Sequence, residues 1–304
     1  MNLSRLLFAI AAVCCFSPIL RGQTNIIEDK EIESLVQQQQ RKALSVLSRE
    51  DTIAASVHWP NIKPELFFAN VRKNITYPGK INQGAMTNFC GYAAMTHLLV
   101  KYHPEIYLQY ITDLYRNGKA VLPNKTLAPS QAVRVAAGTL KNKGELDILD
   151  ADQLWFLTLA DEFKGYMNIV DQKYQPGDEN KIWAGTNFAK FNNMLKAFTD
   201  DKLTMAGSDF LRPSKRSFYE YIAEELQKGV VLLYVNSKFL YPHNFKLFRL
   251  RAPTHFIVLY NMYPVGDQIE IKYWDYGLKT EQLITRKRLF KLIFGITTIS
   301  DSSQ

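Results

Sequence analysis

The sequence predicts an α+β fold, with helices before Gly229 and strands after it. Before Gly229, apolar residues recur at intervals of three and four, which is helical spacing. After it, β-branched and aromatic residues alternate around Pro/Gly turns, which indicates antiparallel strands. The 304 residues are 47% apolar and 12% aromatic, enough for a large core and unlike a disordered or disulfide-rich chain. We expect two lobes that share one cleft.

Residues 1–23 have the layout of a secretory signal peptide. Arg5 precedes an apolar run over 6–16, and Pro18 and Gly22-Gln23 follow it. The run is shorter than the roughly 20 residues of a membrane-spanning helix. We therefore expect an exported protein, periplasmic or secreted, with no stable membrane insertion after signal removal.

Two other interpretations of this segment stay open. It could remain as an uncleaved anchor, or it could be a lipoprotein signal with Cys14 or Cys15 as the lipidated residue. Lipidation is disfavoured because Val13 and Cys14, which precede these cysteines, are not the small residues of such signals. Removal of the segment leaves Cys90 as a solitary cysteine with no intramolecular disulfide partner.

The charge is basic and diffuse. The chain has 37 Lys and Arg against 29 Asp and Glu, so that without the two arginines of residues 1–23 the formal charge is +6. This surplus fits contact with anionic envelope polymers, although most such charge is solvated surface. Since no basic stretch has interleaved aromatic residues, we expect no nucleic-acid partner.

Helical patterns cover most of the first part. Residues 24–50 predict an amphipathic helix, either a stalk or a pro-like segment, and 51–304 the main domain. Residues 51–82 contain three prolines and are expected to be irregular. A further amphipathic helix is expected from an N-capping Asn88 to Pro104. Other helices are expected over 105–116, 130–141, 151–164, 187–199 and 215–228.

Strands are expected over 230–237, 254–262, 268–276 and 289–299. A Pro-Val-Gly-Asp turn separates the second strand from the third, which predicts an antiparallel hairpin.

Cys90 is the candidate nucleophile, because it begins a helix. A thiol attacks as thiolate, and a free cysteine with a pKa of about 8.5 is only a few per cent ionised at neutral pH. The partial positive charge of a helix N-terminus and an adjacent imidazolium both favour the thiolate. Gly91 is expected to let a substrate approach the backbone. The alternative is an inert buried thiol.

His255 is the best candidate for the imidazole. His97 lies about 10 Å along the helix from Cys90, and His103 is expected at the C-terminal cap of the same helix. His58 and His243 lie in Pro-containing loops. His255 instead opens an apolar strand. The predicted hairpin returns Trp274-Asp275 beside it, so that Asp275 could orient the ring.

The remaining requirement is a donor to the oxyanion that forms during acyl transfer. The backbone N–H of Cys90 and the side-chain amide of Gln83 are the candidates. The scattered histidines and single cysteine show no metal-ligand spacing, and no cofactor is expected.

These residues resemble the papain-like cysteine peptidases, in particular the branch of bacterial double-glycine leader peptidases. The resemblance covers about 83–299 and rests on four stretches: Gln83 with Asn88-Phe89-Cys90-Gly91-Tyr92-Ala93-Ala94, Leu226 to Val231, Thr254 to Leu259, and Tyr273-Trp274-Asp275-Tyr276-Gly277. It implies a papain-like fold with nucleophile Cys90, base His255, orienting Asp275 and oxyanion donor Gln83. The spacing from Gln83 to Cys90 is one residue longer than the family pattern, so Asn82 or Asn88 could replace Gln83.

The resemblance implies an exported cysteine peptidase that acts on a peptide or protein substrate. Three alternatives remain on the same scaffold: an amidase of cell-wall peptides, a glutamine deamidase or transferase, and a non-catalytic binding module.

Overall fold

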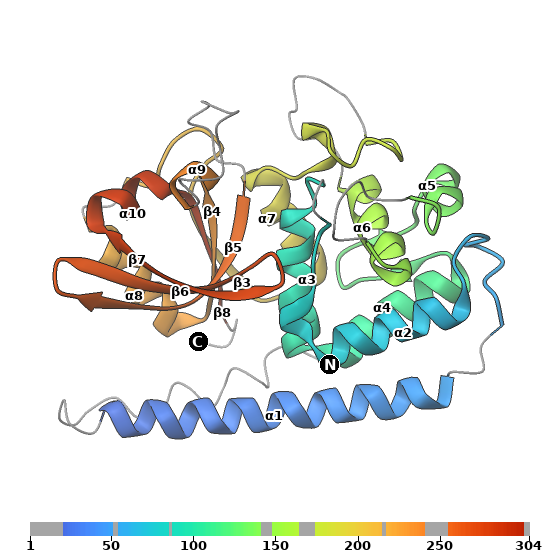
Figure 1. Cartoon of the computed structure of the whole chain (residues 1–304), viewed down its shortest axis with the longest axis horizontal. Coiled ribbons are helices and arrows are strands. Elements are labelled where there is room, and N and C mark those ends of the chain that lie inside the picture. Colours follow the sequence, from blue (N-terminus) through green and yellow to red (C-terminus); the bar gives the residue numbers. More distant parts are fainter. Residues whose placement is uncertain are drawn as a thin grey trace.

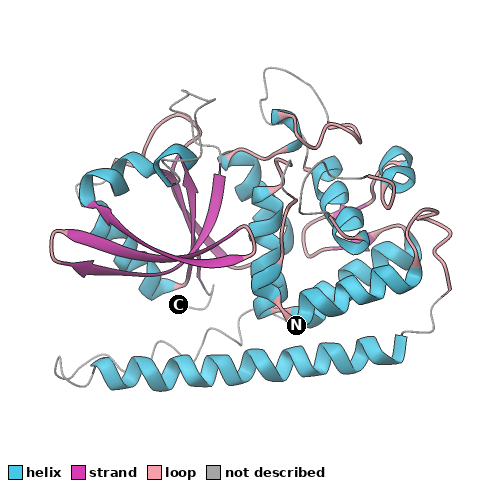
Figure 2. Ribbon diagram, viewed as in Figure 1, coloured by secondary structure: helices cyan, strands magenta, loops and turns pink. Residues whose placement is uncertain are grey.

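The structure is a computed structural model that describes residues 21–50, 54–84, 87–140, 148–163, 174–214, 217–240 and 255–300. It combines helices with an antiparallel sheet, so the predicted α+β class is confirmed (Figure 1, Figure 2). Almost all of the predicted signal peptide lies outside the described residues, and so do His243 and Thr254.

Helices make up most of the described chain before residue 200. They are α1 (Arg21–Glu50), α2 (Pro64–Thr76), α3 (Cys90–Tyr102), α4 (Pro104–Asn117), α5 (Gln131–Ala136), α6 (Asp150–Glu162) and α7 (Phe188–Phe198), with the 3-10 helices η3 (Pro78–Lys80) and η4 (Ile182–Ala184) and the short strands β1 (Ala120–Val121) and β2 (Thr126–Leu127). Figure 1 shows α1 along one side of the molecule, where it packs against α2 and α4.

The prediction of an irregular segment over 51–82 is wrong where α2 forms. Pro64 lies in the first turn, where its missing N–H removes no helical hydrogen bond. Phe67, Val71 and Ile75 follow at helical spacing and are buried. Pro64, expected to disfavour a helix, is thus the first residue of one.

A six-stranded sheet forms the other part, in the order β3-β8-β4-β5-β6-β7 with every neighbouring pair antiparallel. Its strands are β3 (Lys202–Gly207), β4 (Val230–Val235), β5 (His255–Val265), β6 (Gln268–Asp275), β7 (Leu278–Thr285) and β8 (Ile293–Ser300). Helices α8 (Phe218–Lys228), α9 (Ser237–Leu240) and α10 (Arg286–Leu292) accompany them. The predicted strand 289–299 is therefore helical at its start. The edge strands β3 and β7 are additions to the prediction.

The two faces of the sheet bury different clusters. Leu232 and Tyr234 of β4 belong to the core shared with the helical part, and Tyr234 stacks on Phe188 of α7. Val231 and Leu233 point to the opposite face, where α8 and α10 cover them. The sheet therefore lies between two helical layers.

Helix α3 lies between the sheet and the other helices (Figure 1) and packs against both β5 and α4. Every residue from Cys90 to Val100 is buried. The prediction of an amphipathic helix is therefore wrong for α3, because a helix enclosed on all sides has no solvent face. This central position brings the start of α3 next to the start of β5.

Candidate active site

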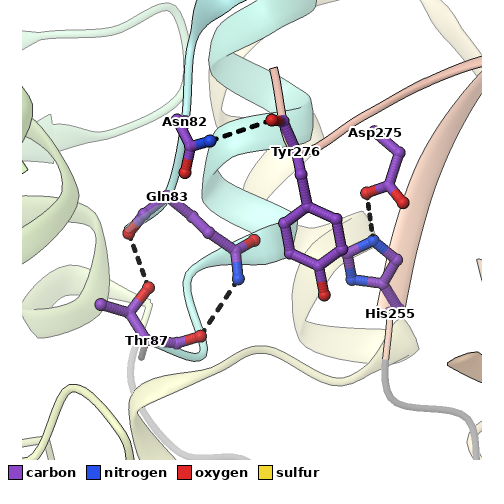
Figure 3. Close-up of polar contacts among 6 residues, drawn as sticks. All are labelled: Asn82, Gln83, Thr87, His255, Asp275 and Tyr276. Carbon is purple, nitrogen blue, oxygen red and sulfur yellow. Dashed lines mark hydrogen bonds and ion pairs between the residues drawn. The ribbon is translucent and has the colours of Figure 1, made fainter. Parts of the chain in front are cut away.

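His255 and Asp275 form a buried pair at the ends of β5 and β6. Nε2 of His255 and Oδ1 of Asp275 are 2.5 Å apart, and the two residues are 3% and 2% exposed (Figure 3). Because an ionised carboxylate only accepts hydrogen bonds, the N–H of Nε2 donates a hydrogen bond to Asp275. The ring's other nitrogen, Nδ1, is then the one that can face a nucleophile.

The strands bring this pair together through a different register from the one predicted. Trp274 pairs with Val258, and the register shifts between Leu259 and Asn261. His255 pairs with Val235 of β4 and lies beyond the paired part of the β5–β6 ladder. The two side chains therefore meet diagonally across the end of the hairpin.

Cys90 is the first residue of α3 and is 8% exposed. It is the free cysteine of the described residues. A hydrogen bond between its side chain and the ring of His255 is one of the contacts that raise the pKa of His255. The imidazole therefore contacts both the thiol and the carboxylate, and a helix N-terminus adds partial positive charge beside the sulfur.

The pKa of His255 responds to opposing effects. Burial, the largest, lowers it, whereas the charges of Asp275 and Tyr276 and the hydrogen bonds to Asp275 and Cys90 raise it. The raising effects win, so the pKa lies well above 6.5. The ring is thus an imidazolium at neutral pH, which stabilises a thiolate beside it.

Two predictions about the start of α3 are wrong. Phe89, not Asn88, occupies the N-cap, and the Asn88 side chain instead donates to the carbonyl of Lys181 at 2.8 Å. A Cβ at Gly91 would lie 2.4 Å from Cγ2 of Thr186 and 3.3 Å from the Phe256 ring. Gly91 therefore allows α3 to pack closely on its neighbours, and does not face a substrate.

Gln83 lies in the extended segment after η3 and is buried. Its side-chain Nε2 donates to the backbone carbonyl of Thr87 at 3.1 Å, and its backbone carbonyl accepts from the Thr87 hydroxyl at 2.6 Å (Figure 3). The first bond holds the side-chain amide, whose NH2 group has a second hydrogen that can be donated to an oxyanion. Of the two alternative donors, Asn82 donates to the carbonyl of Tyr276 at 2.9 Å and Asn88 donates to that of Lys181.

Tyr276 is a site residue that the sequence did not single out. Its ring stacks on His255, with centroids 4.5 Å apart and planes 16° apart (Figure 3). Burial raises the pKa of its phenol, His255 lowers it, and the charges of Cys90 and Asp275 raise it again. The phenol is thus within electrostatic reach of all three side chains. The turn sequence Asp-Tyr-Gly, with a large aromatic residue in the middle, is the signal that could have identified it.

His97 has a structural role, in agreement with the expectation that it is not the partner of Cys90. Its Nδ1 is 2.9 Å from the carbonyl of Pro78, its Nε2 is 2.8 Å from the Tyr260 hydroxyl, and its ring stacks on Trp274. Burial lowers its pKa to about 3, so the ring is neutral. Nδ1 then donates to Pro78 and Nε2 accepts from Tyr260. Trp274 in turn donates to the carbonyl of Gly79, so this cluster holds the segment that leads to Gln83.

Two of the other histidines are accounted for. His103 forms the C-cap of α3, as predicted, and burial lowers its pKa to about 4. His58 lies against Gly118, far from Cys90 along the chain. Across the described ranges, no group of three or more His, Cys, Asp or Glu side chains is arranged to hold a metal ion.

Comparison with family models, with curated protein sequences and with solved structures finds no match. Among the residues described, no helix combines the length and the apolar character that a membrane crossing requires.

Proposed function

We propose that this chain is an exported cysteine hydrolase of papain-like fold that cleaves a peptide or amide bond. The observation that carries the proposal is the single imidazole of His255, which bonds the Asp275 carboxylate on one side and the Cys90 side chain on the other. This is the arrangement that thiol acyl transfer requires: a nucleophile, a proton carrier, and a group that orients the carrier.

In the first half of the reaction, the Cys90 thiolate attacks the carbonyl carbon of the substrate. A C–S bond forms and the carbonyl oxygen takes the electron pair as an oxyanion. The backbone N–H of Cys90 and Nε2 of Gln83 are the proposed donors to that oxygen. When the oxyanion collapses, the C–N bond breaks, and the leaving amine takes the proton that His255 holds.

In the second half, the neutral His255 removes a proton from water as the water attacks the thioester. The new tetrahedral intermediate expels the thiolate and releases the acid, while His255 is again an imidazolium. Asp275 keeps Nε2 protonated throughout, so that Nδ1 exchanges the proton. Over the whole cycle, one water molecule is consumed and one amine and one acid are released for each amide bond broken.

The division of these side chains between the two parts of the fold also favours a papain-like scaffold. Cys90 begins a buried helix, and His255 and Asp275 come from adjacent strands of an antiparallel sheet. This is the arrangement expected from the resemblance, which also suggests export and a peptide, protein or cell-wall peptide substrate.

The reactivity of Cys90 tests the proposal before a substrate is known. The chain also contains Cys14 and Cys15, so a Cys14→Ser/Cys15→Ser background makes Cys90 the single thiol. At about pH 6, a thiol with an ordinary pKa is well under 1% ionised. We expect iodoacetamide to alkylate Cys90 at least about tenfold faster than free cysteine under these conditions.

His255→Ala should remove this advantage, whereas His103→Ala, at a histidine remote from the thiol in the fold, should keep it. A Cys90 that reacts no faster than free cysteine, or equally fast with and without His255, would favour the binding module and overturn the proposal. For a reactive Cys90, release of amine from casein, peptidoglycan stem peptides and glutamine-containing peptides then identifies the substrate class.

A further inference from the structure

A rigid turn outside the candidate site presents two large apolar side chains to solvent. Phe210 is 78% exposed and Leu211 is 74% exposed. The turn is closed by its own hydrogen bonds: the hydroxyl of Ser208 accepts from the N–H groups of Phe210 and Leu211, and the N–H of Ser208 donates to the carbonyl of Leu211 at 3.0 Å. The exposure is therefore built into the turn.

The turn is also anchored to the body of the protein on both sides. Oδ1 of Asp209 accepts from the N–H of Phe188 at the start of α7, at 2.6 Å. The N–H of Ser208 lies 3.2 Å from the carbonyl of Phe294 in β8. These contacts hold the tip in place, so Phe210 and Leu211 cannot fold back into the core without breaking them.

Cations follow this tip in the chain and lie on the neighbouring helix α10. Arg212 donates to the carbonyl of Lys291 at 3.1 Å, and its guanidinium lies 4.1 Å from the ring centroid of Phe294. These contacts join the turn to α10, whose exposed face carries Lys287, Lys291 and the half-exposed Phe290. We call this surface the tip face: Phe210, Leu211, Arg212, Arg286, Lys287, Phe290 and Lys291.

Two acidic residues near the tip face, Asp209 and Glu220, each have a partner in the protein. Asp209 accepts a hydrogen bond from the N–H of Phe188 in α7, and Glu220 of α8 pairs with Arg286 at 3.3 Å on the surface. Glu220 therefore offsets the charge of Arg286, and Arg212, Lys287 and Lys291 are the remaining cations of the tip face. The tip face thus combines two adjacent, protruding apolar side chains with positive charge.

We propose that the tip face docks on an anionic phospholipid bilayer. Phe210 and Leu211 enter the boundary between headgroups and acyl chains, and Arg212, Lys287 and Lys291 contact the lipid phosphates. Apolar side chains at a projecting end suit a fluid interface into which they can insert, whereas a folded protein partner would need a matching pocket. The inference is independent of the proposed hydrolase activity, because none of these residues belongs to the candidate active site.

Sedimentation with vesicles tests the proposal, using the full chain and phosphatidylcholine vesicles with or without phosphatidylglycerol. We expect the wild type to bind the anionic vesicles more tightly, and the excess to disappear at high salt. Phe210→Ser/Leu211→Ser should weaken binding at least about tenfold. Lys287→Glu/Lys291→Glu should weaken it at least about 25-fold, since each cation contributes a factor of about five.

Matched controls lie on other surfaces. Val57→Ser removes an apolar residue that is 88% exposed, and Lys119→Glu/Lys279→Glu reverses two exposed charges. The apolar residues 6–16 are the same in every variant, so differences between variants report the tip face alone. Equal binding by the tip-face variants and the controls would overturn the proposal. Self-association without vesicles that Phe210→Ser/Leu211→Ser abolishes would assign the face to a second copy of the chain, and would overturn it as well.

Discussion

The imidazole of His255 and the phenol ring of Tyr276 lie face to face, with 4.5 Å between their centroids. Tyr276 directly follows Asp275, so one turn of the chain supplies both the carboxylate that binds Nε2 and the ring that covers a face of the same imidazole. Asn82 holds this turn through the carbonyl of Tyr276. A ring fixed at its edge and on its face keeps one orientation, and orientation controls proton transfer.

Replacement of Tyr276 by alanine should therefore slow the reaction of Cys90. Without the stacked ring, the imidazole of His255 can rotate away from the thiol, and we expect the alkylation rate at about pH 6 to fall about tenfold. Tyr276→Phe keeps the ring and should stay within about twofold of the wild type. The second-order rate with iodoacetamide, measured by mass spectrometry of the Cys90 peptide, provides the comparison.

The backbone at Tyr276 supplies the control. Its φ of 46° is in the left-handed region, where a side chain costs free energy that glycine avoids. The free energy of unfolding of Tyr276→Gly should be about 1 kcal/mol higher than that of Tyr276→Ala. Cys90 should be alkylated equally slowly in both variants. A glycine variant as reactive as the wild type would show that the ring is not needed.

Asp275→Asn should lower the pKa of His255. The carboxylate is a main contribution that raises this pKa, while burial lowers it. With the charge removed and the burial retained, we expect the pKa to fall by about one unit or more. Titration of the histidine ring signals by NMR measures it, with His255→Ala to assign the signal.

Two other histidines serve as internal references in the same spectra. The pKa of His97 is lowered to about 3 and that of His103 to about 4, in both cases chiefly by burial. Neither owes its shift to Asp275, so both should be unchanged in Asp275→Asn. An unaltered His255 signal, or a parallel movement of all three, would contradict the assigned role of the carboxylate.

The grouping of Cys90, His255 and Asp275 could be predicted because each residue begins or ends a regular element. The predicted hairpin is symmetric, whereas the actual register is not: β5 continues to Val265 and contains an irregularity after Leu259. Sequence alternation identifies strands but does not show where one residue is added to the ladder. His255 and Asp275 are still in contact, because their side chains reach each other across the shifted register.

The sequence did not predict β3, β7 or the stack of Tyr276 on His255, and each omission has a physical reason. β3 and β7 are edge strands, and most of their residues are at least partly exposed, so apolar and polar residues do not alternate clearly. The Asp-Tyr-Gly turn could have identified Tyr276, but its left-handed backbone is uncommon at a non-glycine residue, and the sequence does not indicate that its ring stacks on His255.

Gly91→Ala should destabilise the protein through a single close contact. The added methyl group would lie 2.4 Å from Cγ2 of Thr186, with ring carbons of Phe191 and Phe256 at 3.2 and 3.3 Å. Because these neighbours are buried, the strain is not easily relieved, and we expect a loss of about 1–3 kcal/mol in the free energy of unfolding. Denaturant unfolding measures this loss.

A double mutant identifies the source of the strain. Thr186→Ser deletes the methyl group that Gly91→Ala would meet, and it keeps the hydroxyl that donates to the carbonyl of Asn187. We expect Gly91→Ala/Thr186→Ser to recover at least about half of the lost stability, as a positive coupling in the cycle. Additive losses would mean that the contact with Thr186 is not the cause.

A buried carboxylate in the helical part should make stability depend on pH. Asp152 of α6 is 6% exposed and accepts hydrogen bonds from Asn70 at 3.1 Å and Asn74 at 2.7 Å, both on α2. Burial, the largest effect, raises its pKa, and these bonds and the charge of Lys73 lower it, so that the result is about 6 against an ordinary 3.8. The folded protein therefore binds a proton more tightly than the unfolded chain does.

The sign of the effect follows from that difference. The stabilisation is fully present below the unfolded pKa of 3.8 and is lost as the pH rises through about 6. The unfolding free energy of the wild type relative to Asp152→Asn should thus fall by about 2 to 2.5 kcal/mol between about pH 4 and pH 8. His97 and His103 have lowered pKa values, so they destabilise the fold as the pH falls below 6.5. Their effect partly hides that of Asp152 in the wild type alone, and the difference between wild type and variant removes it. If the wild type and Asp152→Asn changed in parallel with pH, Asp152 would not be the group that titrates.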